Sequence, residues 1–119
     1  MPVVWGTNPE FEAISREITR LCPEFCPALT EPRRVVLLYA LAQGPRNVSA
    51  LAALLGIAQP AASRHLKMLH QLGLVQSVHR GSSVEYSLTD RRLIDAFDTL
   101  RLVLREALAR AAQENAETR

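Results

Sequence analysis

The chain has 119 residues, a mass of 13.2 kDa and a net charge of +2, which fits one domain and leaves no room for a second core. With 48% hydrophobic and 22% charged residues, the composition excludes a disordered, collagen-like or disulfide-scaffold protein. No uninterrupted apolar run exceeds eight residues, whereas a transmembrane helix needs roughly 20, so no membrane span is expected.

The N-terminal third predicts two helices separated by a bend. Residues 9–21 repeat apolar side chains at steps of three and four, which is typical of one helical face. Pro23 and Pro27 bias the residues before them away from the α region, so a bend or loop is expected that places Cys22 and Cys26 at a junction. Thr30-Glu31-Pro32 predicts the start of a buried helix over residues 33–43.

Residues 49–72 have the outline of a helix-turn-helix. Val48 is expected in a short strand, and Ser49 is expected to cap a helix over residues 50–55 that Gly56 ends. Pro60 begins the next helix, which runs to about Leu72. Two short helices joined by three or four residues with a glycine are typical of this motif.

The C-terminal part predicts a β-hairpin and a long helix. Residues 74–80 and 83–88 alternate apolar and polar side chains about a Gly-Ser turn. Thr89-Asp90 is expected to cap a helix over about residues 91–112, followed by a frayed polar tail over 113–119. Together the elements predict a mainly α fold with a small β-hairpin (α+β): a single winged helix-turn-helix domain over residues 1–119, with five helices and a wing over about 74–88.

The charge is unevenly distributed along this fold. Residues 32–84 contain no Asp or Glu and carry six basic side chains, which leaves the flanks net acidic. Such asymmetry is typical of a nucleic-acid-binding face, because neutralised phosphates release counterions. A solvated basic surface would give the same pattern. The six basic residues are Arg33, Arg34, Arg46, Arg64, Lys67 and Arg80.

The helix after Pro60 has the two faces that a DNA-recognition helix needs. At 100° per residue, Ala62, Leu66 and Leu69 share one side, and Arg64, Lys67 and Gln71 lie opposite. Side chains near its start would reach base edges in the major groove, and the other cations would contact phosphates. An ordinary amphipathic surface helix is the alternative. His65 and His70 are expected to be surface hydrogen-bonding residues. The candidate DNA-contacting residues are Gln59, Ser63 and Arg64 for bases, Lys67 and Arg80 for phosphates, and Ala61.

These segments resemble the ArsR/SmtB family of winged-helix repressors over almost the whole chain. The resemblance is carried by residues 28–34, 48–69 and 73–75, by Arg80-Gly81 and by Tyr86-Ser87-Leu88. It implies a homodimer that sits on a palindromic operator and leaves it when an inducer binds or modifies the protein. Where such proteins often have Ser, this chain has Ala58, so a helix cap worth about 1 kcal/mol is expected to be missing.

The last helix carries an apolar seam that could pack inward or against a partner. Because the first and last helices, over about residues 9–21 and 91–112, are not needed to build the wing, a dimer interface is the favoured use. Two-fold symmetry would then set the recognition helices about 34 Å apart on a pseudo-palindromic site. The seam consists of Leu93, Phe97, Leu100, Leu104, Ala107 and Ala111.

Members of the family that the chain resembles sense metals through a cysteine motif on the third helix or through His and acidic residues on the last. Residues 49–56 hold no cysteine and residues 91–112 hold no histidine, so no metal ligands are expected there. Cys22 and Cys26 remain. They could bind arsenite or another soft ion, oxidise to a disulfide or a sulfur-bridged pair, or be small buried apolar residues. Because arsenite prefers three thiolates, thiol oxidation or reactive sulfur is favoured as the signal, acting by altering the angle between the recognition helices.

No catalytic constellation or phosphate-binding loop is evident, so the chain is predicted not to be an enzyme and to need no cofactor. The expected partners are double-stranded operator DNA, a second copy of the chain, and a small inducer or oxidant. A winged helix that binds only proteins is the rival interpretation. Because the N-terminus lacks the features of a secretory signal, a cytoplasmic location is expected.

Overall fold

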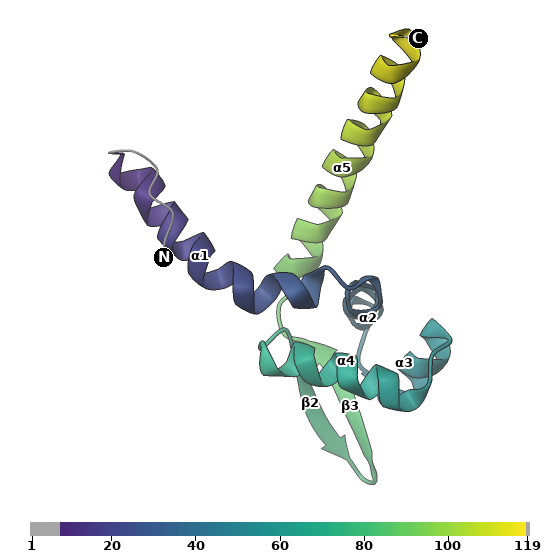
Figure 1. The fold of residues 1–119 in the computed structure, drawn as a ribbon. Coiled ribbons are helices and arrows are strands. Elements are labelled where there is room, and N and C mark those ends of the chain that lie inside the picture. Colours follow the sequence, from purple (N-terminus) through teal and green to yellow (C-terminus); the bar gives the residue numbers. More distant parts are fainter. Residues whose placement is uncertain (1–7, 119) are drawn as a thin grey trace. The chain divides into compact units, whose positions relative to one another are not determined.

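The computed structural model describes residues 8–118, which belong to two compact units: the first ends at Thr89 and the second begins at Asp90. The predicted set of five helices and a hairpin is confirmed within these residues (Figure 1). The elements are α1 (Pro9–Leu29), α2 (Pro32–Ala42), β1 (Arg46–Asn47), α3 (Val48–Leu55), α4 (Gln59–Gln71), β2 (Val75–Arg80), β3 (Ser83–Leu88) and α5 (Arg92–Glu117).

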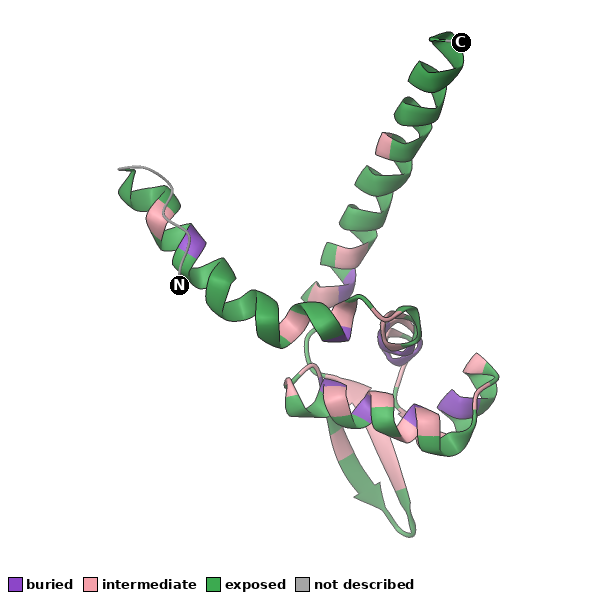
Figure 2. Ribbon diagram, viewed as in Figure 1, coloured by how far each residue is buried: buried purple, intermediate pink, exposed green. Residues whose placement is uncertain are grey.

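The core of the first unit lies around α2, which contacts α1, α3, α4 and β3. Figure 2 shows buried residues on α2 and on parts of α3 and α4. Burial of each large aliphatic side chain stabilises the fold by about 1.5–3 kcal/mol. The largest fully buried side chains are Leu37, Leu38, Leu51, Leu66, Leu69 and Val75.

The helix-turn-helix is held by local caps at both ends of α3. The Asn47 side chain accepts a hydrogen bond from the Ala50 N–H at 2.8 Å, so α3 begins at Val48. The predicted strand at Val48 and cap at Ser49 are therefore wrong. At the other end Gly56 is left-handed with φ 65°, and the Ile57 N–H reaches back to the Ala52 carbonyl at 3.1 Å, which ends α3 as predicted.

The wing is a two-stranded hairpin extended by one short strand. The sheet is antiparallel in the order β1-β3-β2, and β2 pairs with β3 from Val75↔Leu88 to Arg80↔Ser83 across a two-residue turn. Arg46 of β1 pairs with Tyr86 of β3. The predicted hairpin is confirmed, and α4 packs against β2.

The predicted loop is wrong, because α1 runs unbroken through Pro23 and Pro27. Each proline removes one hydrogen bond, to the carbonyl four residues earlier, but this side of the helix is exposed, so water can satisfy the freed carbonyl. The ends are secured by the Asn8 side chain, which accepts from the Glu10 N–H, and by the Thr30 N–H, which donates to the Cys26 carbonyl. Helix α1 is bent along its length rather than straight (Figure 1).

The second unit is α5, which begins where predicted. The Asp90 carboxylate accepts the Arg92 N–H at 2.9 Å and pairs with the Arg92 guanidinium at 2.7 Å. These bonds lower the pKa of Asp90 to about 2. The helix continues to Glu117, so residues 113–117, predicted to fray, are helical. Within residues 8–118 no helix combines the length and apolar character needed to cross a membrane.

Candidate nucleic-acid interface and thiol pair

Helix α4 has one buried and one exposed face, as predicted. Ala62, Leu66 and Leu69 are fully buried, whereas Arg64 and Lys67 are exposed. The apolar face fixes α4 against α2 and α3. The two cations are therefore presented to solvent by a helix that is itself well anchored.

The remaining candidate DNA-contacting residues lie at two places. Gln59, Ser63 and Val48 line a shallow pocket at the start of α4, which groups two of the predicted base-contacting side chains. Ala61 is half-buried in the first turn. The N-cap residue Ala58 forms no side-chain cap, as predicted, so the positive end of the α4 dipole carries no local acceptor from that side chain.

Arg80 lies at the end of β2, beside the hairpin turn. Its side chain is 68% exposed and pairs with Glu85 at 3.3 Å. An exposed pair of this kind contributes about 0–1 kcal/mol, so the guanidinium can exchange Glu85 for a phosphate at little cost. The sequence pattern predicts phosphate contacts for Arg80 but gives no sign of this carboxylate partner.

Arg34 forms a bridge that sequence analysis did not detect. Its Nε donates to His65 Nδ1 on α4 at 3.2 Å, and its Nη1 donates to the Pro27 carbonyl at the end of α1 at 2.9 Å. Nothing in the sequence marks this pair, because Arg34 and His65 are 31 positions apart. His65 is hydrogen-bonded, as predicted, but half-buried.

The environment of His65 favours the neutral imidazole. Desolvation is the largest cause that lowers the pKa of His65 below its usual 6.5, and the charge of Arg34 is the second. Arg33 and Arg64 act in the same direction, and Glu31 opposes them. A neutral imidazole leaves Nδ1 free to accept the Arg34 hydrogen bond.

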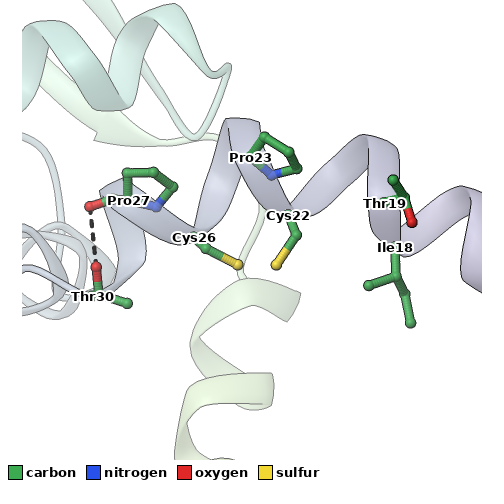
Figure 3. A pocket seen from close by; sticks show the side chains of 7 residues that line it. All are labelled: Ile18, Thr19, Cys22, Pro23, Cys26, Pro27 and Thr30. Atoms are coloured by element: carbon green, nitrogen blue, oxygen red, sulfur yellow. Dashed lines mark hydrogen bonds between the residues drawn. The ribbon is translucent and has the colours of Figure 1, made fainter. Parts of the chain in front are cut away.

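Cys22 and Cys26 are free, exposed thiols on successive turns of α1, and their side chains point toward one another (Figure 3). A hydrogen bond with Cys22 raises the pKa of the Cys26 thiol, with smaller effects of desolvation and of the Cys22 charge. The convergence expected from their spacing is confirmed. Their predicted place at a junction between helices is wrong, and so is the alternative that they are buried apolar residues.

The two thiols line a shallow, mainly apolar pocket on α1 (Figure 3). Within residues 8–118, no group of three or more His, Cys, Asp or Glu side chains lies close enough to hold a metal ion. One chain therefore offers two thiolates and no third ligand of these types beside them. The pocket is lined by Ile18, Thr19, Cys22, Pro23, Cys26, Pro27 and Thr30.

The buried core, the two-sided α4 and the hairpin beside it define a winged helix-turn-helix protein. Residues 31–77 match the sequence profile of the bacterial regulatory proteins of the arsR family. Through this match and the relatives described next, the chain is similar to the ArsR/SmtB family of winged helix-turn-helix transcriptional regulators.

Two curated relatives come from different bacteria. The chain is 39% identical over 71 residues to the HTH-type transcriptional regulator NmtR of Mycobacterium tuberculosis, covering 60% of this chain and 59% of NmtR. It is 33% identical over 86 residues to a transcriptional repressor SmtB homolog of Synechocystis, covering 72% of this chain and 65% of that protein. The match thus spans less than two thirds of each relative.

A solved structure supports the same fold over most of the chain. The homodimeric winged helix-turn-helix DNA-binding domain of a possible ArsR-family transcriptional regulator from Mycobacterium bovis superposes with a TM-score of 0.65 at 28% identity. The comparison covers 88% of this chain and 94% of that domain.

Proposed function

We propose that this protein is a DNA-binding transcriptional repressor that acts as a homodimer on a pseudo-palindromic operator. The observation that carries the proposal is α4, whose apolar side is fully buried while Arg64 and Lys67 face solvent. A helix in the major groove requires such an arrangement. The acid-free stretch over residues 32–84 supports it, because no carboxylate within that stretch repels phosphates.

The exposed side chains divide by what they can contact. Arg64 can pair in bidentate fashion with guanine, and Gln59 with adenine. Lys67 and Arg80 supply charge for phosphates, which adds affinity without sequence preference. Arg64 should therefore control specificity, and Lys67 should control affinity and its salt dependence.

A labelled duplex that the protein selects from a randomised DNA pool provides the probe for fluorescence anisotropy. Arg64→Ala should weaken binding by about 1–3 kcal/mol and relax the preference at one base position. Lys67→Ala should weaken binding to all duplexes alike and reduce the slope of log affinity against log salt by about 1. Gln71→Ala, on the exposed side near the end of α4, is the matched control. Unchanged binding by both cation variants would reject α4 as the DNA-reading element.

We further propose that an oxidant sensed at Cys22 and Cys26 releases the protein from DNA. The two exposed thiols point toward one another, which supports this proposal. With hydrogen peroxide, the Cys22 thiolate attacks one oxygen, forming a sulfenic acid and hydroxide. The Cys26 sulfur then displaces the sulfenic hydroxyl as water and forms the disulfide. Two thiols thus lose two electrons and two protons, and the peroxide becomes two waters.

Closing this disulfide strains α1. Residues four apart on a regular helix have Cβ atoms about 5–6 Å apart, but a disulfide needs about 3.5–4.5 Å. The backbone around Pro23 has to shift to close the gap, and it already lacks the hydrogen bond that Pro23 cannot donate. Oxidation should therefore deform the end of α1.

Mass spectrometry after exposure to peroxide, polysulfide or arsenite, read beside the anisotropy assay, tests the sensor. Peroxide should remove about 2 Da and weaken DNA binding, while Cys22→Ser and Cys26→Ser should bind DNA normally and no longer respond. Added sulfur atoms would identify a polysulfide signal, and retained arsenic would favour the soft-ion alternative. A full response in either serine variant would show that the pair is not the switch.

A further inference from the structure

The Arg34 side chain is hydrogen-bonded to both α1 and α4. It projects from the first turn of α2 and donates to the Pro27 carbonyl at 2.9 Å and to His65 Nδ1 at 3.2 Å. Pro27 follows Cys26 directly, and His65 follows Arg64 directly. The guanidinium thus joins the residue next to the thiol pair to the residue next to the proposed base-reading arginine.

The contact with Pro27 satisfies a specific need of α1. The last carbonyls of a helix lack backbone donors, and α1 has no basic residue in its last turn. Arg34 supplies that positive charge from the next helix, where it also complements the helix dipole. Thr30 Oγ1 donates to the same carbonyl at 3.3 Å. The position of the Pro27 carbonyl therefore decides whether Arg34 is held.

The contact with His65 needs the planar fork of an arginine. Donors on Nε and Nη1 point in different fixed directions, so one guanidinium serves both acceptors. A lysine at this position would offer a single ammonium group. His65 lies between Arg64 and the fully buried Leu66, so the ring is held on a part of α4 that cannot turn independently of the core.

We propose that Arg34 is a positioning residue that transmits the state of the Cys22–Cys26 pair to α4 through the Pro27 carbonyl and the His65 imidazole. This inference rests on the proposed thiol sensor. When Cys22 and Cys26 form a disulfide, the deformed end of α1 carries the Pro27 carbonyl away from Arg34. The guanidinium then loses one of its two anchors, its hydrogen bond to His65 is released, and α4 loses the contact that ties it to α1.

Histidine NMR tests the bridge without DNA. In the reduced protein, Arg34→Met should remove both the hydrogen bond and a nearby charge and so raise the pKa of His65. Arg33→Met is the matched control, because it removes a positive charge at the neighbouring exposed position without touching the bridge, and it should raise the pKa of His65 less than Arg34→Met does. The His65 ring is also near Glu31 and Arg64, which both variants leave in place.

The decisive comparison is between the reduced protein and the protein in which hydrogen peroxide has oxidised Cys22 and Cys26 to the disulfide. Formation of the disulfide should shift the His65 ring resonances in the wild type and in Arg33→Met but not in Arg34→Met. Unchanged His65 signals in the disulfide form of the wild type would overturn the inference. An equal shift in Arg34→Met would also overturn it, because the signal would then reach α4 by another route.

DNA affinity separates failure of the bridge from failure of the sensor. Formation of the Cys22–Cys26 disulfide should weaken DNA binding about tenfold or more in the wild type and in Arg33→Met, and by less than about threefold in Arg34→Met. If His65 responds as expected but wild-type affinity does not change, the bridge stands and the proposed thiol-sensing function fails. If Arg34→Met and the wild type lose affinity equally, the bridge does not transmit the signal.

Discussion

Gly56 connects α3 to the turn before α4 with φ 65°, and outside Gly56 and its two chain neighbours no described atom lies within 4 Å of the position that a Cβ would occupy. A side chain there would meet open space, so the whole cost of substitution comes from the backbone. The end of α3 therefore depends on one residue that must adopt a left-handed backbone, and the space around it imposes no further requirement.

Gly56→Ala is predicted to lower the free energy of unfolding by about 1–2 kcal/mol, the cost of placing a Cβ in the left-handed region. Chemical denaturation of the variant and the wild type measures this difference. Gly56→Asn is the control, because asparagine tolerates that region better and should cost less. Equal stability of Gly56→Ala and wild type would contradict the left-handed turn.

For single residues, the sequence predicts those roles that depend only on the residue's own segment of the chain. The buried Ala62, Leu66 and Leu69 follow from helical periodicity, and the missing cap at Ala58 from its side chain alone. The Arg34 bridge could not be predicted, because it depends on how α1, α2 and α4 meet. For the same reason the Glu85 partner of Arg80 becomes evident only when the strand register is known.

Element boundaries depend on which nearby side chain satisfies a backbone group first. Asn47 captures the Ala50 N–H and starts α3 two residues before the predicted first residue. In α1 the local bias against helix before Pro23 and Pro27 is real, but helix on both sides and solvent around the freed carbonyls outweigh it. Residues 113–117 stay helical although their composition resembles a frayed tail.

Asp90 is predicted to determine the start of α5. Its pKa of about 2 lies below the ordinary 3.8, so this contribution to stability is fully present above the ordinary value and is lost as the pH falls toward 2. Asp90→Ala should reduce hydrogen-exchange protection in the first turn of α5.

Asp90→Asn is the matched variant for this test. Its amide oxygen can still accept the Arg92 N–H, but it carries no charge to titrate. It should keep most of the protection and show none of the loss between about pH 4 and pH 2 that this carboxylate causes. Equal protection in Asp90→Ala and wild type would show that the carboxylate does not cap α5.

At the scale of the whole molecule, two helices expose apolar side chains that a single chain leaves uncovered. Leu100, Leu104 and Leu108 of α5 are 50–72% exposed, and Phe11, Ile14 and Ile18 of α1 are 46–55% exposed. Exposed apolar surface of this kind marks an interaction site. The periodicity of both helices predicts the apolar residues but not what covers them, because that information lies in a second chain. A homodimer remains our proposal for their use.

Leu104→Lys is predicted to shift the protein from dimer to monomer, because it places a charge in the apolar seam of α5. Analytical ultracentrifugation measures the change, and circular dichroism checks that the helices remain. Glu106→Lys introduces the same residue two positions away on the exposed helix and should leave the dimer intact. A monomeric wild type at micromolar concentration would refute the dimer.

The two prolines of α1 have a further consequence for how fast the thiols react. Neither Pro23 nor Pro27 has an amide proton to donate, so opening the last turns of α1 breaks fewer hydrogen bonds than opening an equal length of an ordinary helix. This segment should therefore open locally at a free energy well below that of global unfolding. The rate at which Cys22 and Cys26 close into a disulfide would then be governed by this local opening and not by the stability of the winged-helix core.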